Sequence, residues 1–339
     1  MRVTRLALLH LSVVVAAHWT NYKFKKMEGA RPPFFMFYLK ITLQLLLGLT
    51  FIASAILKLF PIEPFEINFV DVGLASWKTA PFFSRAIIGL ELFLGAMLLS
   101  FLYTGKKVYV STIALLVVFS LYLIVQLILD GEGDCGCFGT YLQMTPLESL
   151  VKNGLMIAMT ALLVVNPIGW KWKRANVLAI TVFGLSIATP HIVNPIDLIA
   201  AANLQEEITD FPLDVDALES NALNDVPVNL RQGTHVIGFF SLKCSHCRTL
   251  AMKMQVLKKE HDAYNMLMVL NGKADQLPEF LSATGSADIP HFRLPAEPFA
   301  KLTGGRVPIV FLAHDGKIIR ILRLPEINHD TLSKFFPLS

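Results

Sequence analysis

The chain of 339 residues contains four cysteines, and these four cysteines form two close pairs. Cys135 and Cys137 flank a single glycine, whereas Cys244 and Cys247 enclose two residues in the stretch Cys-Ser-His-Cys. Two thiols this close in sequence can exchange a disulfide with each other and with a partner through a mixed disulfide. The simplest interpretation of four cysteines used as two pairs is a dithiol relay.

Cys244 has the features of an attacking thiol. It follows a short apolar run, 235–242, and precedes a helical pattern, so we expect it at a helix N-terminus. Unpaired N–H groups at such an end favour the thiolate, and Lys243 and His246 add positive charge. Cys247 lies one turn further on and is predicted to be the resolving thiol. The alternatives are a structural disulfide or half of a zinc site.

Cys135 and Cys137 lie between two long apolar runs, 108–129 and 150–165. Gly136 permits a turn that brings the two Cα atoms into bridging range, and the resulting small ring is expected to be strained and labile. We therefore predict a redox-active pair at the mouth of a membrane bundle. The alternatives are a permanent structural bridge, or a zinc site shared with the second pair. Zinc would require two distant pairs to meet and stay closed, so no metal is expected.

The composition indicates a membrane domain followed by a soluble domain. Hydrophobic residues make up 54% of the chain and charged residues only 17%, against about 25% in soluble proteins. The apolar excess lies before residue 195. Five apolar segments have close to the roughly 20 residues that a membrane-crossing helix needs. These segments are 37–60, 82–103, 108–129, 150–165 and 175–193.

The charges of the loops predict the orientation in the membrane. Nine basic residues fall in segments on one side, which the positive-inside rule assigns to the cytoplasm: Lys23, Lys25, Lys26, Arg31, Lys106, Lys107, Lys171, Lys173 and Arg174. The opposite loops, 61–81 and 130–148, are acidic. Both cysteine pairs and everything after residue 194 are then outside, in an oxidising compartment. We predict a multi-pass protein of the cytoplasmic (inner) membrane with a periplasmic C-terminal domain.

The sequence predicts four segments. They are an apolar and basic N-terminal segment of undefined role over 1–35, a membrane domain over 36–195, a tether over 196–230 and a soluble domain over 231–339. The net charge of +4 reflects basic cytoplasmic loops, and no basic stripe with interleaved aromatic residues points to nucleic acid. The expected partners are the lipid bilayer and cysteine-containing proteins outside the cytoplasm.

The soluble domain is similar to the thioredoxin fold. The pattern of strand, CxxC, helix, strand, helix, then Val307-Pro308 before a hairpin and a last helix follows the thioredoxin order, with Asp315-Gly316 as the hairpin turn. In that family the matching proline is cis and packs against the CxxC, so the resemblance adds Pro308 to the candidate catalytic residues Cys244, His246 and Cys247. The family's tryptophan before the first cysteine is replaced by Lys243.

Residues 36–168 resemble the DoxX/MauE family of redox-associated membrane proteins. The residues that carry this resemblance are the run 54–59 (SAILKL), Glu91 and the run 135–139 (CGCFG). The resemblance implies an α-helical four-helix bundle, to which this chain adds a fifth span, and a link to thiol or sulfur oxidation. With a fused thioredoxin-like domain, it suggests a membrane thiol reductase or oxidase that carries its own soluble partner. Vitamin K epoxide reductase homologues fused to thioredoxin are analogous.

Lys58 and Glu91 are ionisable residues inside predicted spans, where such residues are functional candidates by default. Lys58 and Glu91 would neutralise each other as an ion pair, or Lys58 would extend to the interface while Glu91 holds helices together. Trp77 belongs to an apolar loop that either caps a quinone pocket or anchors at the interface. These three residues are the candidates for cofactor binding.

The hypothesis that follows is a membrane thiol–disulfide oxidoreductase. Electrons would pass between extracytoplasmic protein thiols, the Cys244/Cys247 site, the Cys135/Cys137 site and a quinone, with the redox-active disulfides as the resident cofactors. One rival is an oxidoreductase that couples a sulfur compound or small thiol to quinone. The other is a non-enzymatic assembly factor for a disulfide-containing periplasmic client.

Overall fold

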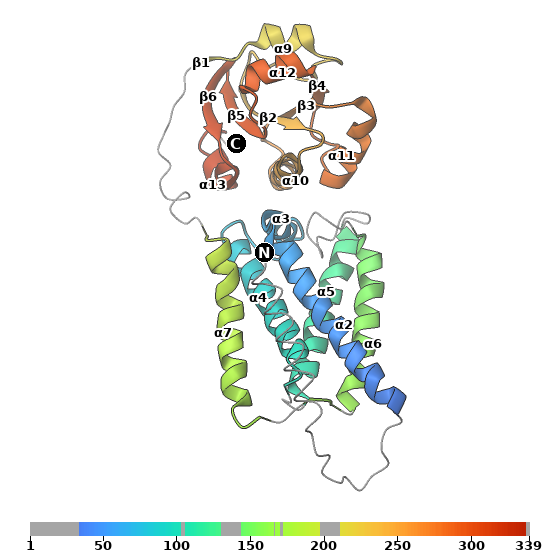
Figure 1. Cartoon of the computed structure of the whole chain (residues 1–339). Coiled ribbons are helices and arrows are strands. Elements are labelled where there is room, and N and C mark those ends of the chain that lie inside the picture. Colours follow the sequence, from blue (N-terminus) through green and yellow to red (C-terminus); the bar gives the residue numbers. More distant parts are fainter. Residues whose placement is uncertain are drawn as a thin grey trace, which may run out of the picture. The chain divides into compact units, whose positions relative to one another are not determined.

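The computed structural model describes residues 34–102, 106–129, 144–165, 167–169, 172–196 and 211–336. In these ranges, five helices are long and apolar enough to cross a membrane, and the chain is a multi-pass membrane protein (Figure 1). They are α2 (Phe34–Leu59), α4 (Ala80–Leu99), α5 (Lys107–Leu129), α6 (Pro146–Val165) and α7 (Ala175–Val193). All five predicted spans are present, and the fourth starts four residues earlier than expected, at Pro146.

Helices α2 and α4 pack closely against each other. A side chain at Gly48 would come within 2.7 Å of Leu99, and one at Gly95 within 2.8 Å of Ile52, so small residues let the two helices approach. The amide of Gln44 donates to the Leu98 carbonyl at 2.8 Å and accepts from the Tyr109 hydroxyl at 2.8 Å. Gln44 therefore connects α2, α4 and α5, which is the interhelical role that its place inside a span suggests.

The connection between α2 and α4 contains a short helix, α3 (Glu63–Asp71). The sequence predicted only a loop that lies on the mouth of the bundle. Pro64 near the helix start and acidic residues in the first turn favour this helix, and it buries apolar side chains that include Phe65 and Phe69. The apolar residues of the loop are therefore core residues of the membrane domain.

Polar contacts join the helix ends on the side of the bundle where α3 lies. Arg85 pairs with Glu66 at 2.6 Å, and its Nε donates to the Asn194 carbonyl at 2.9 Å. The Asn194 amide in turn donates to the Leu59 carbonyl at 2.8 Å. The ends of α2 and α7 and the start of α4 are thus fixed to one another. Burial raises the pKa of Glu66, while the neighbouring Arg85 acts against that shift.

The C-terminal domain is built on a sheet that has six strands in the described part of the chain, in the order β1-β6-β5-β2-β3-β4. Strands β2, β3 and β4 run parallel, and β5 and β6 continue the sheet antiparallel. The strands are β1 (Phe211–Pro212), β2 (Thr234–Ser241), β3 (Met266–Asn271), β4 (His291–Arg293), β5 (Ile309–His314) and β6 (Lys317–Leu322).

Helices cover both faces of this sheet (Figure 1). On β2, Phe240 points to the core under α10 (Ser245–Glu260), α11 (Leu277–Thr284) and α13 (His329–Leu332). Its neighbour Phe239 points to the opposite core, under α9 (Val215–Asn221) and α12 (Ala296–Thr303). Successive strand residues alternate between faces, so β2 supplies both cores.

One expectation about this domain is corrected, and two of its elements were not predicted. The segment 196–230 was predicted to be a tether, but β1 and α9 lie within it, and Leu218 and Leu230 are fully buried in the core. Residues 211–230 therefore belong to the folded domain. Strand β4 and helix α12 were not predicted. The turn at Asp315-Gly316 is confirmed, with positive φ at both residues as a tight hairpin requires.

The domain has a thioredoxin-like fold. A parallel β2–α10–β3 unit carries the CxxC at the start of its helix, and the β5–β6 hairpin and α13 follow. The Val307–Pro308 peptide bond directly before β5 is cis, as the resemblance implied. The expected fold class, a membrane bundle with a fifth span followed by an α/β thioredoxin-like domain, is confirmed.

We expect Phe239→Ala to destabilise the C-terminal domain by about 3–5 kcal/mol, because it removes a fully buried ring that packs against Phe299 and Phe311. Pulse proteolysis of the full chain in urea measures this loss. Ile321→Ala on β6 is the matched control, since Ile321 is exposed and should change stability little. Equal effects of the two variants would contradict the two-faced core.

Candidate active site

The end of β2 and the start of α10 position the Cys244/Cys247 pair. Strand β2 ends at Ser241, and Cys244 is the N-cap residue of α10, with an extended backbone. The Cys244 backbone N–H donates to the Ser241 carbonyl at 3.0 Å, which closes the turn. Cys244 Sγ accepts the Cys247 backbone N–H at 3.3 Å. The half-buried sulfur is thus held at a helix N-terminus, as the sequence predicted.

Cys247 has a different environment from Cys244. Its side chain is fully buried in the core under α10, and both thiols are free in this structure. Burial raises the pKa of the Cys247 thiol, and the neighbouring Cys244 sulfur raises it further. The Ser241 backbone N–H donates to Cys247 Sγ at 3.4 Å and acts in the opposite direction. Cys247 is therefore the poorer nucleophile towards a partner's disulfide, and the first attack falls to Cys244.

The two other thioredoxin-type candidates lie near the same end of the sheet. His246 is exposed in the first turn of α10, between the two cysteines. Pro308 directly precedes β5, which pairs antiparallel with β2 and places Ile309 opposite Phe239. Because the two strands are antiparallel, β5 begins at the end of the sheet where β2 finishes. Pro308 and the CxxC therefore lie at the same end of the sheet.

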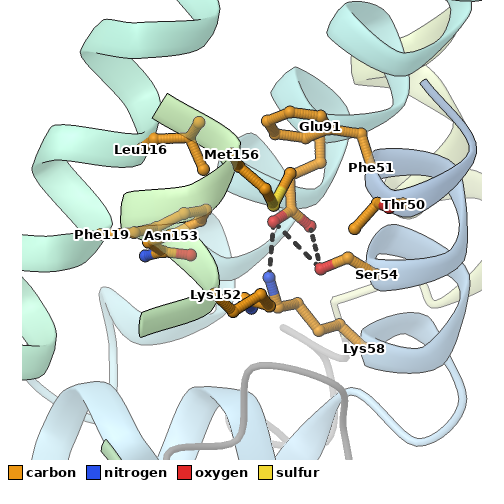
Figure 2. A pocket seen from close by; sticks show the side chains of 10 residues that line it. All are labelled: Thr50, Phe51, Ser54, Lys58, Glu91, Leu116, Phe119, Lys152, Asn153 and Met156. Carbon is orange, nitrogen blue, oxygen red and sulfur yellow. Dashed lines mark hydrogen bonds and ion pairs between the residues drawn. The ribbon is translucent and has the colours of Figure 1, made fainter. Parts of the chain in front are cut away.

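A second polar site lies inside the membrane bundle (Figure 2). Lys58, in the last turn of α2, pairs with Glu91 of α4 at 2.6 Å. Only 3% of the Lys58 side chain and 2% of the Glu91 side chain are exposed. The Ser54 hydroxyl donates to both carboxylate oxygens at 3.3 and 3.4 Å. The predicted alternative in which Lys58 and Glu91 neutralise each other is thus confirmed.

Aromatic rings complete the surroundings of the Lys58 ammonium. Its Nζ lies 5.0 Å from the centre of the Phe65 ring of α3 and 4.7 Å from that of Phe119 of α5. Ring faces attract cations, more strongly where water is excluded. The Lys58 charge is therefore held by a carboxylate and two rings from three different elements.

The ion pair faces a small cavity between α2, α4, α5 and α6 (Figure 2). Its volume is about 20 Å³, which is close to the room that one water molecule needs. Cofactor pockets are usually about 300–1,000 Å³, so a quinone ring does not fit here. The polar lining residues that the sequence did not single out are Thr50, Lys152 and Asn153, and Ser54, the first residue of the run 54–59, also lines the cavity.

Three sequence candidates remain to be placed. Trp77 is half-buried in the turn between α3 and α4 and does not line it. Cys135 and Cys137 fall in 130–143, outside the described residues. Among the residues that are described, no group of three or more His, Cys, Asp or Glu side chains is placed to hold a metal ion.

Comparisons with known proteins agree with a chain of two parts. Residues 36–166 match the family model described as methylamine utilisation protein MauE. The matched residues include nearly all of α2 and the whole of α4, α5 and α6. The chain is also 26% identical over 316 residues to Protein TlpB of Flavobacterium psychrophilum, and the match covers 79% of this chain and 86% of the relative.

Solved structures resemble the C-terminal part. The thioredoxin domain of a thiol-disulfide oxidoreductase from Bacteroides vulgatus matches 32% of this chain and 81% of its own length, at 14% identity and a TM-score of 0.29. A putative protein disulfide isomerase from Bacteroides thetaiotaomicron matches 38% and 83%, at 21% identity and a TM-score of 0.28. The fold assignment depends on the strand order and the CxxC position, not on these two matches.

Alkylation should separate the two described thiols. We expect iodoacetamide to modify Cys244 of the reduced full chain readily and Cys247 very slowly, because Cys247 is buried and its raised pKa leaves little thiolate at and above neutral pH. Peptide mass spectrometry after timed quenching measures both rates. Unfolding in urea is the control and should make the rates similar. Comparable rates in the folded chain would contradict the assigned roles.

The ion pair in the bundle gives a second prediction, on stability. Glu91→Leu leaves the buried Lys58 ammonium without its carboxylate and should destabilise the membrane domain by about 3–5 kcal/mol. The double variant Lys58→Met/Glu91→Leu removes both charges and should recover most of this loss. Thermal unfolding in detergent measures the three proteins. A double variant as unstable as Glu91→Leu would show that the two charges do not stabilise each other.

Proposed function

We propose that this protein is a membrane thiol–disulfide oxidoreductase. Its Cys244/Cys247 site exchanges disulfides with cysteine-containing proteins and with the Cys135/Cys137 pair of the membrane domain. The membrane domain passes the electrons to or from a quinone. The observation that carries the proposal is the pairing of a half-exposed N-cap cysteine with a buried cysteine one turn later, on a thioredoxin-like domain fused to a membrane domain that matches the MauE family model.

The contrast between the two thiols supports directional exchange. Cys244 has an accessible sulfur with a backbone N–H directed at it, so it attacks a disulfide and forms the mixed disulfide. Cys247 lies in the core within the same helical turn and then releases the partner by attacking Cys244. The names of two similar structures, a thiol-disulfide oxidoreductase and a putative protein disulfide isomerase, describe the same chemistry in those proteins.

The membrane domain supports the second half of the proposal. The MauE match spans residues 36–166 and so includes the segment that contains Cys135 and Cys137. That segment connects α5 to α6, and nine basic residues fall in segments on the opposite side of the membrane. By the positive-inside rule, both cysteine pairs face the periplasm of an inner-membrane protein, where disulfides persist.

A mixed-disulfide trap tests the relay between the two pairs. In Cys247→Ser, the resolving thiol is missing, so Cys244 should accumulate as a disulfide with Cys135 or Cys137 in the full chain. Acid quenching, proteolysis without reductant and peptide mass spectrometry identify the crosslinked fragments.

Two matched controls accompany the trap. Cys244→Ser should not accumulate the crosslink, since the remaining Cys247 is buried. Cys247→Ser combined with Cys135→Ser and Cys137→Ser should lose it as well. A Cys247→Ser chain that is trapped only with other proteins, and never with its own membrane pair, would rule out the relay.

A further inference from the structure

The cluster of Ser54, Lys58 and Glu91 has features that a structural contact does not need. Glu91 lies eleven residues after Ala80, the first residue of α4, which at about 1.5 Å per residue places it about 16 Å along the helix. Glu91 therefore lies inside a candidate membrane span, more than two helical turns from either end of α4. Ionisable groups at this depth are costly, and proton relays are one of the functions that retain them.

The charges that face Glu91 come from several elements. Lys58 of α2 is its ion-pair partner, and Lys152 of α6 lines the same cavity (Figure 2). Ser54 adds a hydroxyl donor, and Asn153 of α6 adds a buried amide to the lining. A hydrophobic pair of similar volume would hold these helices together at least as well. The retained charges and the lining therefore fit a role in chemistry better than a role in packing.

The size of the cavity decides which chemistry fits. At about 20 Å³ it has room for one water molecule, and it has several polar partners for that water. It has no room for a quinone ring, for a peptide or for a small thiol such as a cysteine derivative. A carboxylate, an ammonium and a hydroxyl beside room for one water molecule form a set of groups that can move protons.

We propose that Glu91, paired with Lys58 and assisted by Ser54, is a proton-exchange site of the membrane domain. This inference rests on the proposed function, because it assigns the path of a proton in the same reaction. Glu91 takes up a proton as a carboxylic acid and gives it back as the carboxylate paired with Lys58. The Lys58 ammonium, held by Phe65 and Phe119, stabilises the carboxylate between transfers.

The reaction balances without a further reactant. Oxidation of a protein dithiol by a quinone breaks two S–H bonds and forms one S–S bond. Two electrons and two protons leave the thiols and arrive on the quinone, which becomes a quinol. Glu91 carries one of these protons for part of its route and ends the cycle unchanged. Electron flow in the other direction uses the same steps in reverse.

Chemical rescue of Glu91→Ala tests the proposal. The full chain in detergent is given a reduced dithiol protein and a short-chain quinone analogue, and quinone reduction is followed. Glu91→Ala should be slower by about 100-fold, the lower range for losing a general acid–base group. Formate, which enters the space left by the side chain and exchanges a proton, should restore part of the rate. Formamide has nearly the same size and cannot replace a carboxyl proton carrier, so it should not.

Two further variants separate proton transfer from folding. Glu91→Asp keeps a carboxyl group and should retain more activity than Glu91→Ala. Lys58→Met/Glu91→Leu should be nearly as stable as the parent but as slow as Glu91→Ala, because it lacks the proton carrier. The slow variants should still form the mixed disulfide in the Cys247→Ser background, since that step needs only the sulfurs.

Three results would overturn the proton site. Equal rescue by formate and formamide would show that Glu91 only fills space. A parent-like rate in Glu91→Ala, or in the double variant, would show that no proton passes through it. If Cys247→Ser forms the mixed disulfide but the parent chain never reduces the quinone analogue, this would remove the quinone step, and the proton site with it. The thiol relay would survive in each of these cases, and only the absence of the mixed disulfide would reject that relay.

Discussion

The free energy of placing charge in a hydrocarbon environment constrains the whole membrane domain. Lys58 and Glu91 are both almost fully buried, so each requires the other within hydrogen-bond distance. Their contact fixes α2 against α4 at this depth, and the rings of Phe65 and Phe119 extend the same constraint to α3 and α5. Gly48 precedes Lys58 in α2, and Gly95 follows Glu91 in α4. The close approach of the two helices at these glycines lets Lys58 and Glu91 come into contact. The fifth helix, α7, contributes no residue to the cavity lining.

The same desolvation effect distinguishes the two thiols of the thioredoxin-like domain. At the N-cap of α10, Cys244 keeps contact with solvent and receives a backbone N–H. One turn further, Cys247 is enclosed by the core, and its pKa rises because the thiolate would lose its hydration there. No catalytic base needs to be invoked for this order of reactivity. It follows from the positions of the two residues, one at the start of α10 and the other in the core under that helix.

The sequence predicted those features that depend on local pattern. The CxxC after an apolar run, the Asp315-Gly316 turn and the five spans are each specified by a few adjacent residues, and all are present. Lys58 and Glu91 were identifiable because a charge in an apolar span is rare. The two-residue strand β1 and the short helix α9 were missed, since they form only against β6 and the sheet. Ser54 was noted only as part of the run 54–59, and Lys152 and Asn153 were not singled out, because only helix packing brings these residues to one cavity.

The two sites divide the work of thiol oxidation according to what each environment permits. Sulfur exchange needs a nucleophile that a protein partner can reach, and Cys244 is accessible on a water-soluble domain. Proton transfer within a bilayer needs the opposite, a group that is shielded from bulk water and has a counter-charge that stabilises its ionised form between transfers. Glu91 meets that requirement through Lys58 and Ser54. In the proposed reaction the cysteine sulfurs carry the electrons, and the buried carboxyl group of Glu91 carries a proton. A cavity with room for a water molecule but not for a quinone ring is therefore what this arrangement requires.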